Sequence, residues 1–249
     1  MAALSEAVRA ALLGLPPDVH AAEHERMLGG AKEAARELVS ESAVTAMIDH
    51  LPLKEGARII AFGDSHTSDP QSWAVILKDL LTARGASVAI NAAPGDTTTH
   101  GLIRIGEVVA QQPDWVLLLI GVNDARTQGP KPSKTLVDHQ ETVRNLRELH
   151  QRISHETKAR CLWITPPAVN EERVSNHCGL SRFGVRFRNE DIARVVAAIR
   201  DIDAPTVDLF SILGTPPAPE LLMDGGLHFT LAGQRRLAFD VIRGWIKLS

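Results

Sequence analysis

Five short apolar runs, separated by segments with helical periodicity, are the feature that most restricts how this chain can fold. All five lie after residue 57, and they read RIIAF, SVAIN, DWVLLLIG, RCLWIT and PTVDLF. Amphipathic segments such as residues 72–84 and 136–153 lie between them. Two parallel strands need a crossover between them, which is most often a helix. The alternation therefore predicts an α/β domain in which helices cover both faces of a parallel sheet.

The first 53 residues carry no strand signal and are rich in Ala, Glu, Arg and Leu. Apolar residues recur there with a helical period. Pro16-Pro17 separates a first short helix from a second, and Gly29-Gly30 is expected to interrupt the second helix. We therefore predict a helical N-terminal extension over residues 1–53, packed on a main domain over residues 54–249. A homodimer contact through these helices is an alternative use of the extension.

The charge balance and the cysteine count restrict the partners of the chain. Twenty-seven Lys and Arg against 30 Asp and Glu give a formal net charge of −3, without a basic block that would follow a phosphate backbone. The two cysteines show no CxxC metal spacing. There is neither a basic leader nor an apolar run of about twenty residues. We expect a cytoplasmic protein that binds no nucleic acid and has no membrane span.

Polar residues follow the first three apolar runs at the point where each run ends. Ser65 follows the first run, residues 91–99 follow the second, and residues 121–124 follow the third. In a parallel sheet, functional groups gather at the carboxyl ends of the strands, near the point where the strand order reverses. If the order is 2-1-3-4-5, the first strand lies between the second and the third. Donors would then approach Ser65 from both sides.

This placement suits acyl transfer. A serine hydroxyl needs a base to take its proton, and the oxyanion formed on attack needs preorganised N–H donors. The backbone N–H groups of Ser65 and Gly95 and the side-chain amide of Asn123 would supply three donors. His228 is the candidate base, and Asp224, four residues earlier, would orient its ring and stabilise the imidazolium.

Four ordered blocks, GDS, NAAPGDTT, GVND and DGGLHFTLAG, resemble the SGNH (GDSL-like) hydrolase family over roughly residues 57–249. The resemblance implies that Ser65 is the nucleophile, that Gly95 and Asn123 complete the oxyanion hole, and that His228 is the base. The implied fold is a three-layer α/β/α sandwich related to flavodoxin, with a five-stranded parallel sheet. The implied reaction is ester hydrolysis through an acyl-enzyme, without a metal or other cofactor. We expect a small-molecule ester, short-chain or acetyl, but the sequence does not separate a carbohydrate deacetylase from a lysophospholipase, a thioesterase or a general short-chain esterase.

The sequence departs from the family pattern at two points. The family places its acid three residues before the histidine, where this chain has Gly225. Asp224 would reach His228 only if Gly225-Gly226 absorbs the extra residue as a bulge. The alternative is a Ser-His dyad whose histidine is oriented by a backbone carbonyl. The segment before Gly95 is also one residue shorter than the family pattern, which affects the reach of its N–H.

Three polar residues beside the candidate site invite a structural interpretation. We expect Asp64 and Asp124 to support the site by accepting hydrogen bonds that hold the two loops. A carboxylate pointing into an oxyanion site would oppose the charge that develops there. His66 is expected to point away from Ser65, toward the substrate or the surface, because adjacent side chains commonly point apart.

Two other functions compete with ester hydrolysis. Asp64-x-His66, GDTT and GVND together resemble the metal-binding blocks of binuclear metallophosphoesterases, and these residue types suit such metals. The third block, however, has Asp124 where a histidine is expected, and no GHxH occurs near the carboxyl end. A non-catalytic module that binds a small anion is the other alternative. Such a module has no need for a nucleophile, a base and oxyanion donors together.

The loops after the third and fourth apolar runs are expected to form the walls of the substrate pocket. Arg and Lys residues in these loops would favour a negatively charged ester, although solvated surface charges are the plainer interpretation. The residues concerned are Arg126, Lys131, Lys134, Arg182, Arg186 and Arg188.

Overall fold

The computed structural model describes residues 8, 10–11 and 14–248, and it confirms the expected α/β architecture. One sheet has the strand order β2-β1-β3-β4-β5, and every pair of neighbours is parallel. The strands are β1 (Arg58–Gly63), β2 (Ser87–Ala92), β3 (Trp115–Leu119), β4 (Arg160–Ile164) and β5 (Thr206–Val207). The predicted order 2-1-3-4-5 is therefore correct.

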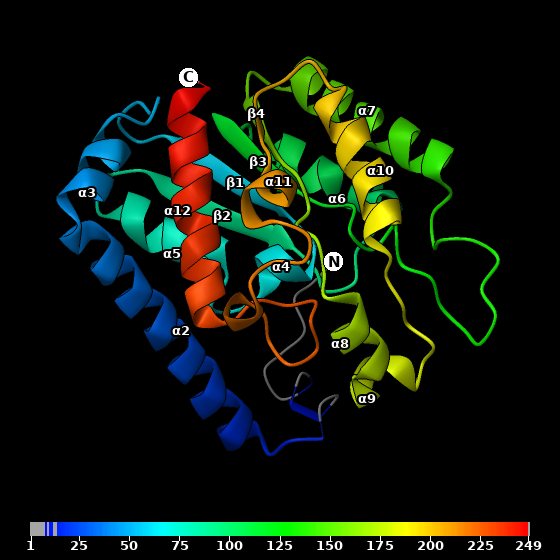
Figure 1. The fold of residues 1–249 in the computed structure, drawn as a ribbon. Helices are drawn as coiled ribbons and strands as arrows, with labels where there is room; N and C mark the ends of the chain where they lie inside the picture. Colours follow the sequence, from blue (N-terminus) through cyan, green and yellow to red (C-terminus); the bar gives the residue numbers. More distant parts are fainter. Residues whose placement is uncertain (1–7, 9, 12–13, 249) are drawn as a thin grey trace.

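Helices cover both faces of the sheet (Figure 1). One face carries α2 (Pro17–Ser40), α3 (Ser42–Asp49), α5 (Trp73–Thr82) and α12 (Leu231–Lys247). The other face carries α6 (Thr98–Ala110), α7 (His139–Glu156) and α10 (Asn189–Arg200). Short helices interrupt the loops: α4 (Ser65–Ser68), α8 (Glu171–Asn176), α9 (Cys178–Ser181), α11 (Leu209–Leu213) and the 3₁₀ helix η1 (Pro219–Leu221).

The central strand shows why its sequence is apolar without interruption. Ile59 and Ala61 face the hydrophobic cluster under α5 and α12, whereas Ile60 and Phe62 face the cluster under α6, α7 and α10. Successive side chains of a strand point to opposite faces of the sheet. Because both faces are covered by helices, every position after Arg58 is buried.

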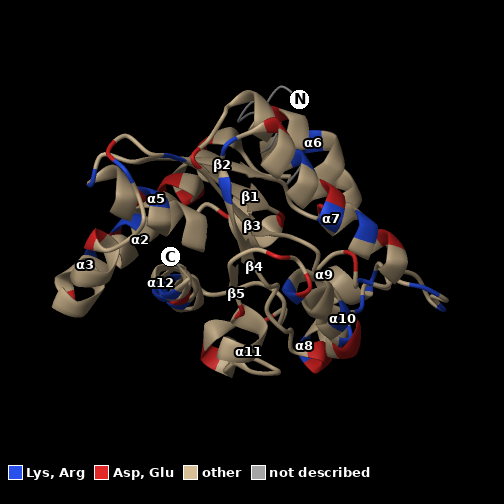
Figure 2. Cartoon of the chain, turned by 90° about the horizontal axis from the view of Figure 1, so that it is seen from above, with Lys and Arg blue, Asp and Glu red and all other residues tan. Residues whose placement is uncertain are grey.

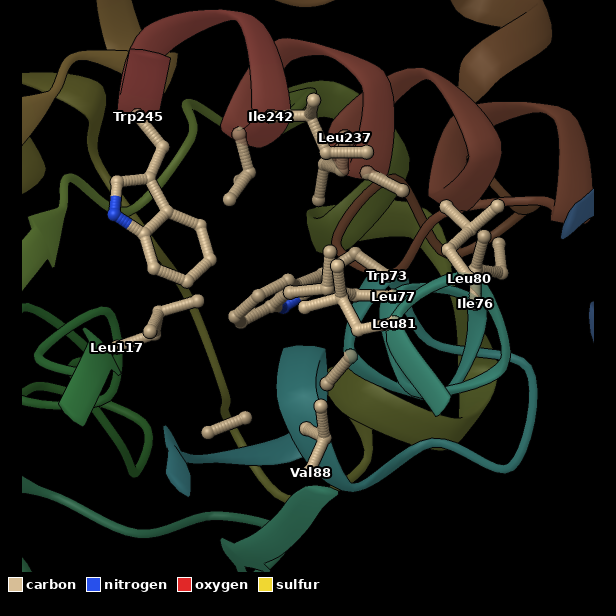
Figure 3. Packing of buried hydrophobic residues seen from close by; sticks show 14 of the residues in the cluster. Trp73, Ile76, Leu77, Leu80, Leu81, Val88, Leu117, Leu237, Ile242 and Trp245 are labelled. Atoms are coloured by element: carbon tan, nitrogen blue, oxygen red, sulfur yellow. The ribbon is translucent and has the colours of Figure 1, made fainter. Parts of the chain in front are cut away.

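Aromatic residues fill the core between the sheet and α12. The rings of Trp245 and Trp115 meet edge to face, with their centroids 4.9 Å apart. Trp73 and Leu77 project from α5 toward Leu117 of the sheet, and Figure 3 shows them between α12 and β3. This packing fixes α12, and with it the loop that enters α12 from the sheet edge.

The N-terminal helix α2 is continuous, so the predicted interruption at Gly29-Gly30 is wrong. Two adjacent glycines weaken an isolated helix by about 1 kcal/mol each, but tertiary packing supplies most helical stability in proteins. The side chain of Leu231 lies against Gly30, at a distance that leaves little room for a Cβ. The short helix expected before Pro16 lies mostly outside the described residues.

The second half of α2 packs closely on the main domain. Its small buried residues, Ala31, Ala34 and Ala35, lie against α5 and α12. Arg235 of α12 also forms ion pairs with two carboxylates of the N-terminal segment, Glu37 and Glu41, at 3.1 and 2.9 Å. No helix in the described ranges is both long enough and apolar enough to cross a membrane.

Gly63, the last residue of β1, offers a test of how tightly the loop that carries Ser65 is packed. A Cβ at this position would overlap the carbonyl oxygen of Leu119 and the side chain of Thr67. Gly63→Ala should therefore lower the free energy of unfolding by about 1–3 kcal/mol in urea denaturation. In the control Gly106→Ala, the new Cβ meets no atom within 4 Å. Because Gly106 lies in helix α6, Gly106→Ala should raise the free energy of unfolding by up to about 1 kcal/mol. Equal effects of the two substitutions would contradict the close packing inferred at Gly63.

Candidate active site

Ser65 lies at the carboxyl end of the central strand, where β1 passes into α4. The Asp64 side chain caps this short helix by accepting the backbone N–H of His66 at 3.0 Å. The backbone N–H groups of Thr67 and Ser68 donate to the carbonyl of Asp64. Ser65 is the first residue of α4, where a helix has no internal acceptor for the N–H. Its amide is thus available to a ligand.

The structure brings Ser65 and His228 together, although 163 residues separate them in the sequence. His228 lies in the loop that precedes α12, and its Nε2 is 3.0 Å from Oγ of Ser65. Burial lowers the pKa of His228 to about 4, and the neighbouring His66 contributes to the shift. The ring is therefore neutral at ordinary pH, the form in which Nε2 can accept the serine proton.

The two oxyanion candidates, Gly95 and Asn123, lie in the loops that follow the strands flanking β1. Gly63 pairs with Ala92 of β2 and with Leu119 of β3, which places these loops on either side of Ser65. The side-chain amide of buried Asn123 donates one hydrogen to the carbonyl of Asp96 at 3.0 Å. That bond fixes the amide and leaves its second hydrogen available.

Gly95 belongs to the same loop as Asp96 and has a positive φ of +80°. Its N–H donates to no group in the described part of the chain. A Cβ at this position would meet no atom within 4 Å, so the space beside Gly95 is open. The geometry thus leaves three N–H groups, from Ser65, Gly95 and Asn123, without a competing acceptor.

Asp124 fastens the loop after β3 to the helices behind it. Its carboxylate accepts the backbone N–H of Thr98 at 2.9 Å, the Thr98 hydroxyl at 2.5 Å and the Thr142 hydroxyl at 3.0 Å. Burial raises the pKa of Asp124, and these hydrogen bonds oppose that shift. The carboxylate is thus engaged with α6 and α7, which leaves its neighbour Asn123 to face the loop after β2.

With this geometry established, comparison with known proteins decides the family. A model of the GDSL-like lipase/acylhydrolase family matches residues 61–236, well over half of the chain. The chain belongs to this family.

The relatives of this GDSL-like chain are distant. A GDSL esterase/lipase from Arabidopsis thaliana is 22% identical over 200 residues, which cover 75% of this chain and 63% of that protein. An alpha/beta hydrolase enzyme from the metagenome of Lake Arreo, Spain, superposes with a TM-score of 0.60 at 19% identity, over 79% of this chain and 98% of that one. An acetyl xylan esterase from Geobacillus stearothermophilus gives a TM-score of 0.57 at 21% identity, over 79% and 97%. At these identities the solved structures establish the fold.

Asp224 is not brought to the histidine of this GDSL-like site. Its side chain is exposed, and no hydrogen bond or ion pair joins it to His228 in the described ranges. The predicted glycine bulge is a tight turn, closed by the Gly226 N–H on the Met223 carbonyl at 2.9 Å. This turn directs Asp224 toward a separate cavity, lined also by His177. The ring of His177 in turn covers Gly225, where the family pattern has its acid.

His66 is buried, with only 1% of its surface exposed, so the expectation that it faces the substrate or the surface is wrong. The cap supplied by Asp64 turns residue 66 inward, beneath the loop that carries His228. Its Nε2 lies 3.0 Å from the carbonyl oxygen of Leu227. Asp64 is also fully buried, and burial raises its pKa to about 7.

Arg104 of α6 is a site residue that sequence reasoning missed. Its guanidinium donates to the carboxylate of Asp96 at 2.7 Å, to the Asn91 side chain, and to the Gly63 carbonyl at 3.1 Å. These three partners lie at the end of β1 and on both sides of Gly95. One largely buried cation therefore holds the loop that carries Gly95 against the end of β1. The sequence gives no signal for this, because Arg104 resembles any other basic residue of an amphipathic helix.

The loop cations divide among different environments. Lys134, Arg186 and Arg188 line a cavity of about 500 Å³ that also includes Asp124 and whose lining does not include Ser65 or His228. Arg188 is paired there with Asp191 at 2.9 Å. Figure 2 shows acidic and basic residues mixed over α7, α8 and α10. Nothing in this distribution singles out a negatively charged ester.

The residues named by the metallophosphoesterase alternative do not form a ligand set. No group of three or more His, Cys, Asp and Glu side chains able to share a metal ion occurs in the described part of the chain. Nε2 of His66 is also engaged with a backbone carbonyl. The family match and the residue geometry thus favour the GDSL-like interpretation.

The contribution of the Arg104–Asp96 ion pair to stability can be measured. Arg104 and Asp96 have side chains only 11% and 12% exposed. Arg104→Met leaves Asp96 without its cation and should lower the free energy of unfolding by on the order of 3 kcal/mol. Arg144→Met, which breaks an exposed pair with Glu141, should cost less than about 0.5 kcal/mol. Urea denaturation measures both free energies of unfolding. Similar losses in the two variants would mean that the Arg104–Asp96 pair stabilises the fold no more than an exposed ion pair does.

Proposed function

We propose that this protein is a serine ester hydrolase that acts on short-chain or acetyl esters. The observation that carries the proposal is the 3.0 Å separation between Ser65 Oγ and His228 Nε2 at the carboxyl edge of the sheet. A nucleophile hydrogen-bonded to a neutral base is the signature of covalent catalysis. Membership of the GDSL-like lipase/acylhydrolase family supports the same reaction class.

In the acylation step, His228 takes the proton of Ser65 while Oγ attacks the carbonyl carbon of the ester. The resulting oxyanion receives hydrogen bonds from the backbone N–H groups of Ser65 and Gly95 and from the Asn123 amide. Each such donor contributes a few kcal/mol to barrier lowering, roughly 3 where one has been removed by mutation. The tetrahedral intermediate collapses when the imidazolium gives its proton to the leaving alkoxide oxygen, which leaves an acyl group on Ser65.

Deacylation repeats the same chemistry with water as the nucleophile. His228 takes a proton from water, and the hydroxide attacks the acyl carbonyl while the same three donors hold the oxyanion. Collapse breaks the bond to Oγ, and His228 returns the proton to Ser65. The carboxylic acid is released and the enzyme is restored.

The preference for a small acyl group is supported by likeness rather than by a defined acyl pocket. The similar solved structures include an acetyl xylan esterase from Geobacillus stearothermophilus. The open space beside Gly95 is compatible with a compact acyl group next to the oxyanion donors. We therefore place acetyl esters first among the substrates.

Three substitutions test the catalytic assignments with p-nitrophenyl acetate, butyrate and octanoate as substrates. Ser65→Ala and His228→Ala should each lower kcat by about a thousandfold or more, because either removes the nucleophile–base pair. Asn123→Ala should lower kcat by about a hundredfold. Activity of the parent should fall as the acyl chain lengthens. Circular dichroism checks that each variant is folded, and a folded Ser65→Ala protein with parental kcat would refute the mechanism.

The pH dependence of the reaction should reflect the environment of His228. The base must be unprotonated, and its pKa is lowered to about 4 from an ordinary value of 6.5. Activity should therefore persist as pH falls below 6.5 and should be lost only as pH falls through about 4. The acid limb of a kcat/KM profile measures this directly. An acid limb centred near 6.5 would contradict the assigned environment of the ring.

A further inference from the structure

His66 is a buried histidine for which the proposed chemistry has no use. It follows the nucleophile directly, yet its side chain is turned away from solvent and packs on the base loop. Its ring meets those of His228 and Phe229 edge to face, with centroids 5.8 and 5.7 Å apart. A polar ring in such a position, joined to the catalytic base, calls for a physical explanation.

The hydrogen bond to Leu227 fixes the tautomer of His66. A carbonyl oxygen only accepts hydrogen bonds, so Nε2 must carry a proton and donate it across the 3.0 Å to Leu227. In the neutral ring, Nδ1 is then an unprotonated acceptor. Nδ1 lies 3.7 Å from Oδ1 of Asp64, and the buried Oδ2 of Asp64 has no partner in the described ranges. Nδ1 of His66 likewise has no hydrogen-bond partner in the described ranges, so the bond to Leu227 is the one that holds the ring.

The carbonyl of Leu227 and the N–H of His228 belong to one rigid peptide plane. Holding that carbonyl therefore sets the direction in which the backbone enters His228. The carbonyl of His228 is held in turn by the backbone N–H of Met223 at 2.8 Å. Nδ1 of the His228 ring, in contrast, bonds to no described residue and is not enclosed. On the side away from Ser65, His228 is thus held through its backbone rather than through Nδ1 of its ring.

We propose that His66 is a positioning residue that aims His228 at Ser65, the task that a carboxylate on the histidine ring would otherwise perform. The inference rests on the proposed function, and it adds which residue orients the base His228. Misplacement of a catalytic group by about 1 Å can cost a hundredfold in rate, so the anchor at Leu227 has a large effect on turnover.

The charged and titratable groups around His66 are consistent with a neutral ring. Burial lowers the pKa of His66, while Asp69 opposes this shift through its charge. Burial raises the pKa of Asp64. His228, the remaining neighbour, is itself held neutral by burial. A neutral histidine avoids the desolvation cost that a buried charge would suffer in this position.

Replacing His66 by Gln or by Asn distinguishes a role in positioning His228 from a role in packing alone. Gln at position 66 extends its N–H to the place of Nε2 and can still donate to Leu227, whereas Asn ends near the place of Nδ1 and cannot. His66→Gln should keep kcat for p-nitrophenyl acetate within about fivefold of the parent, and His66→Asn should lose about a hundredfold with KM little changed. His66→Leu should resemble the Asn variant, and the amide pair decides the matter if the Leu variant does not fold.

The pH profile gives a readout that a purely structural role would not move. Without its anchor the His228 ring meets more water, so the acid limb of kcat/KM should shift upward in His66→Asn and stay in place in His66→Gln. Two controls complete the set. Thr67→Val removes a buried hydroxyl of the same short helix that has no partner among the described residues, and Asp224→Asn neutralises the exposed carboxylate. Both should keep parental kcat.

Equal losses of kcat in the Gln and Asn variants, at equal melting temperatures, would overturn the proposal, because His66 would then act by packing alone. A hundredfold loss in Asp224→Asn would also overturn it, since the exposed carboxylate would then orient the ring. A parent chain that neither turns over esters nor reacts with a fluorophosphonate at Ser65 would instead refute the proposed function.

Discussion

The candidate site depends on one constraint, the parallel pairing of β1 with both β2 and β3. Gly63 lies level with Ala92 on one side and with Leu119 on the other, so three strands end together. Backbone hydrogen bonds of the sheet thereby decide that Ser65, the Gly95 loop and Asn123 are neighbours. The sheet thus brings the three loops close together, and side-chain contacts then set the final distances between their residues.

Two charged residues, Arg104 and Asp124, then fix the loops after β2 and β3 through hydrogen bonds that involve α6. Arg104 holds the Gly95 loop to the end of β1, and Asp124 holds the loop after β3 to α6 and α7. The Asp124 network consists of buried groups, the Arg104 network of largely buried ones, and the charged groups of both are hydrogen-bonded. Satisfied polar networks in a low-dielectric environment are strong and geometrically specific. They give the proposed oxyanion donors, Gly95 and Asn123, fixed positions, which is what preorganised electrostatic catalysis requires.

Much of this was predictable from the sequence, because periodicity and block order are local or linear signals. The strand order, the flanking of Ser65 by two loops and the approach of His228 all follow from the apolar runs and the ordered blocks. Asp224 shows the limit of that reasoning. Its distance from His228 depends on whether the turn at Gly226 directs the Asp224 side chain toward the His228 ring or toward solvent. The number of residues between Asp224 and His228 does not determine that direction. The packing of His177 on Gly225 depends on residues nearly fifty positions away.

The small residues on α2 have a consequence for how the molecule comes apart. Ala31, Ala34 and Ala35 let the helix lie so close to α5 and α12 that all three share one hydrophobic cluster with the sheet. Detaching α2 would expose the apolar surfaces of its neighbours to water. The extension and the sheet therefore lose structure in one cooperative event, whereas the first turns of α2, where no residue is fully buried, can fray alone.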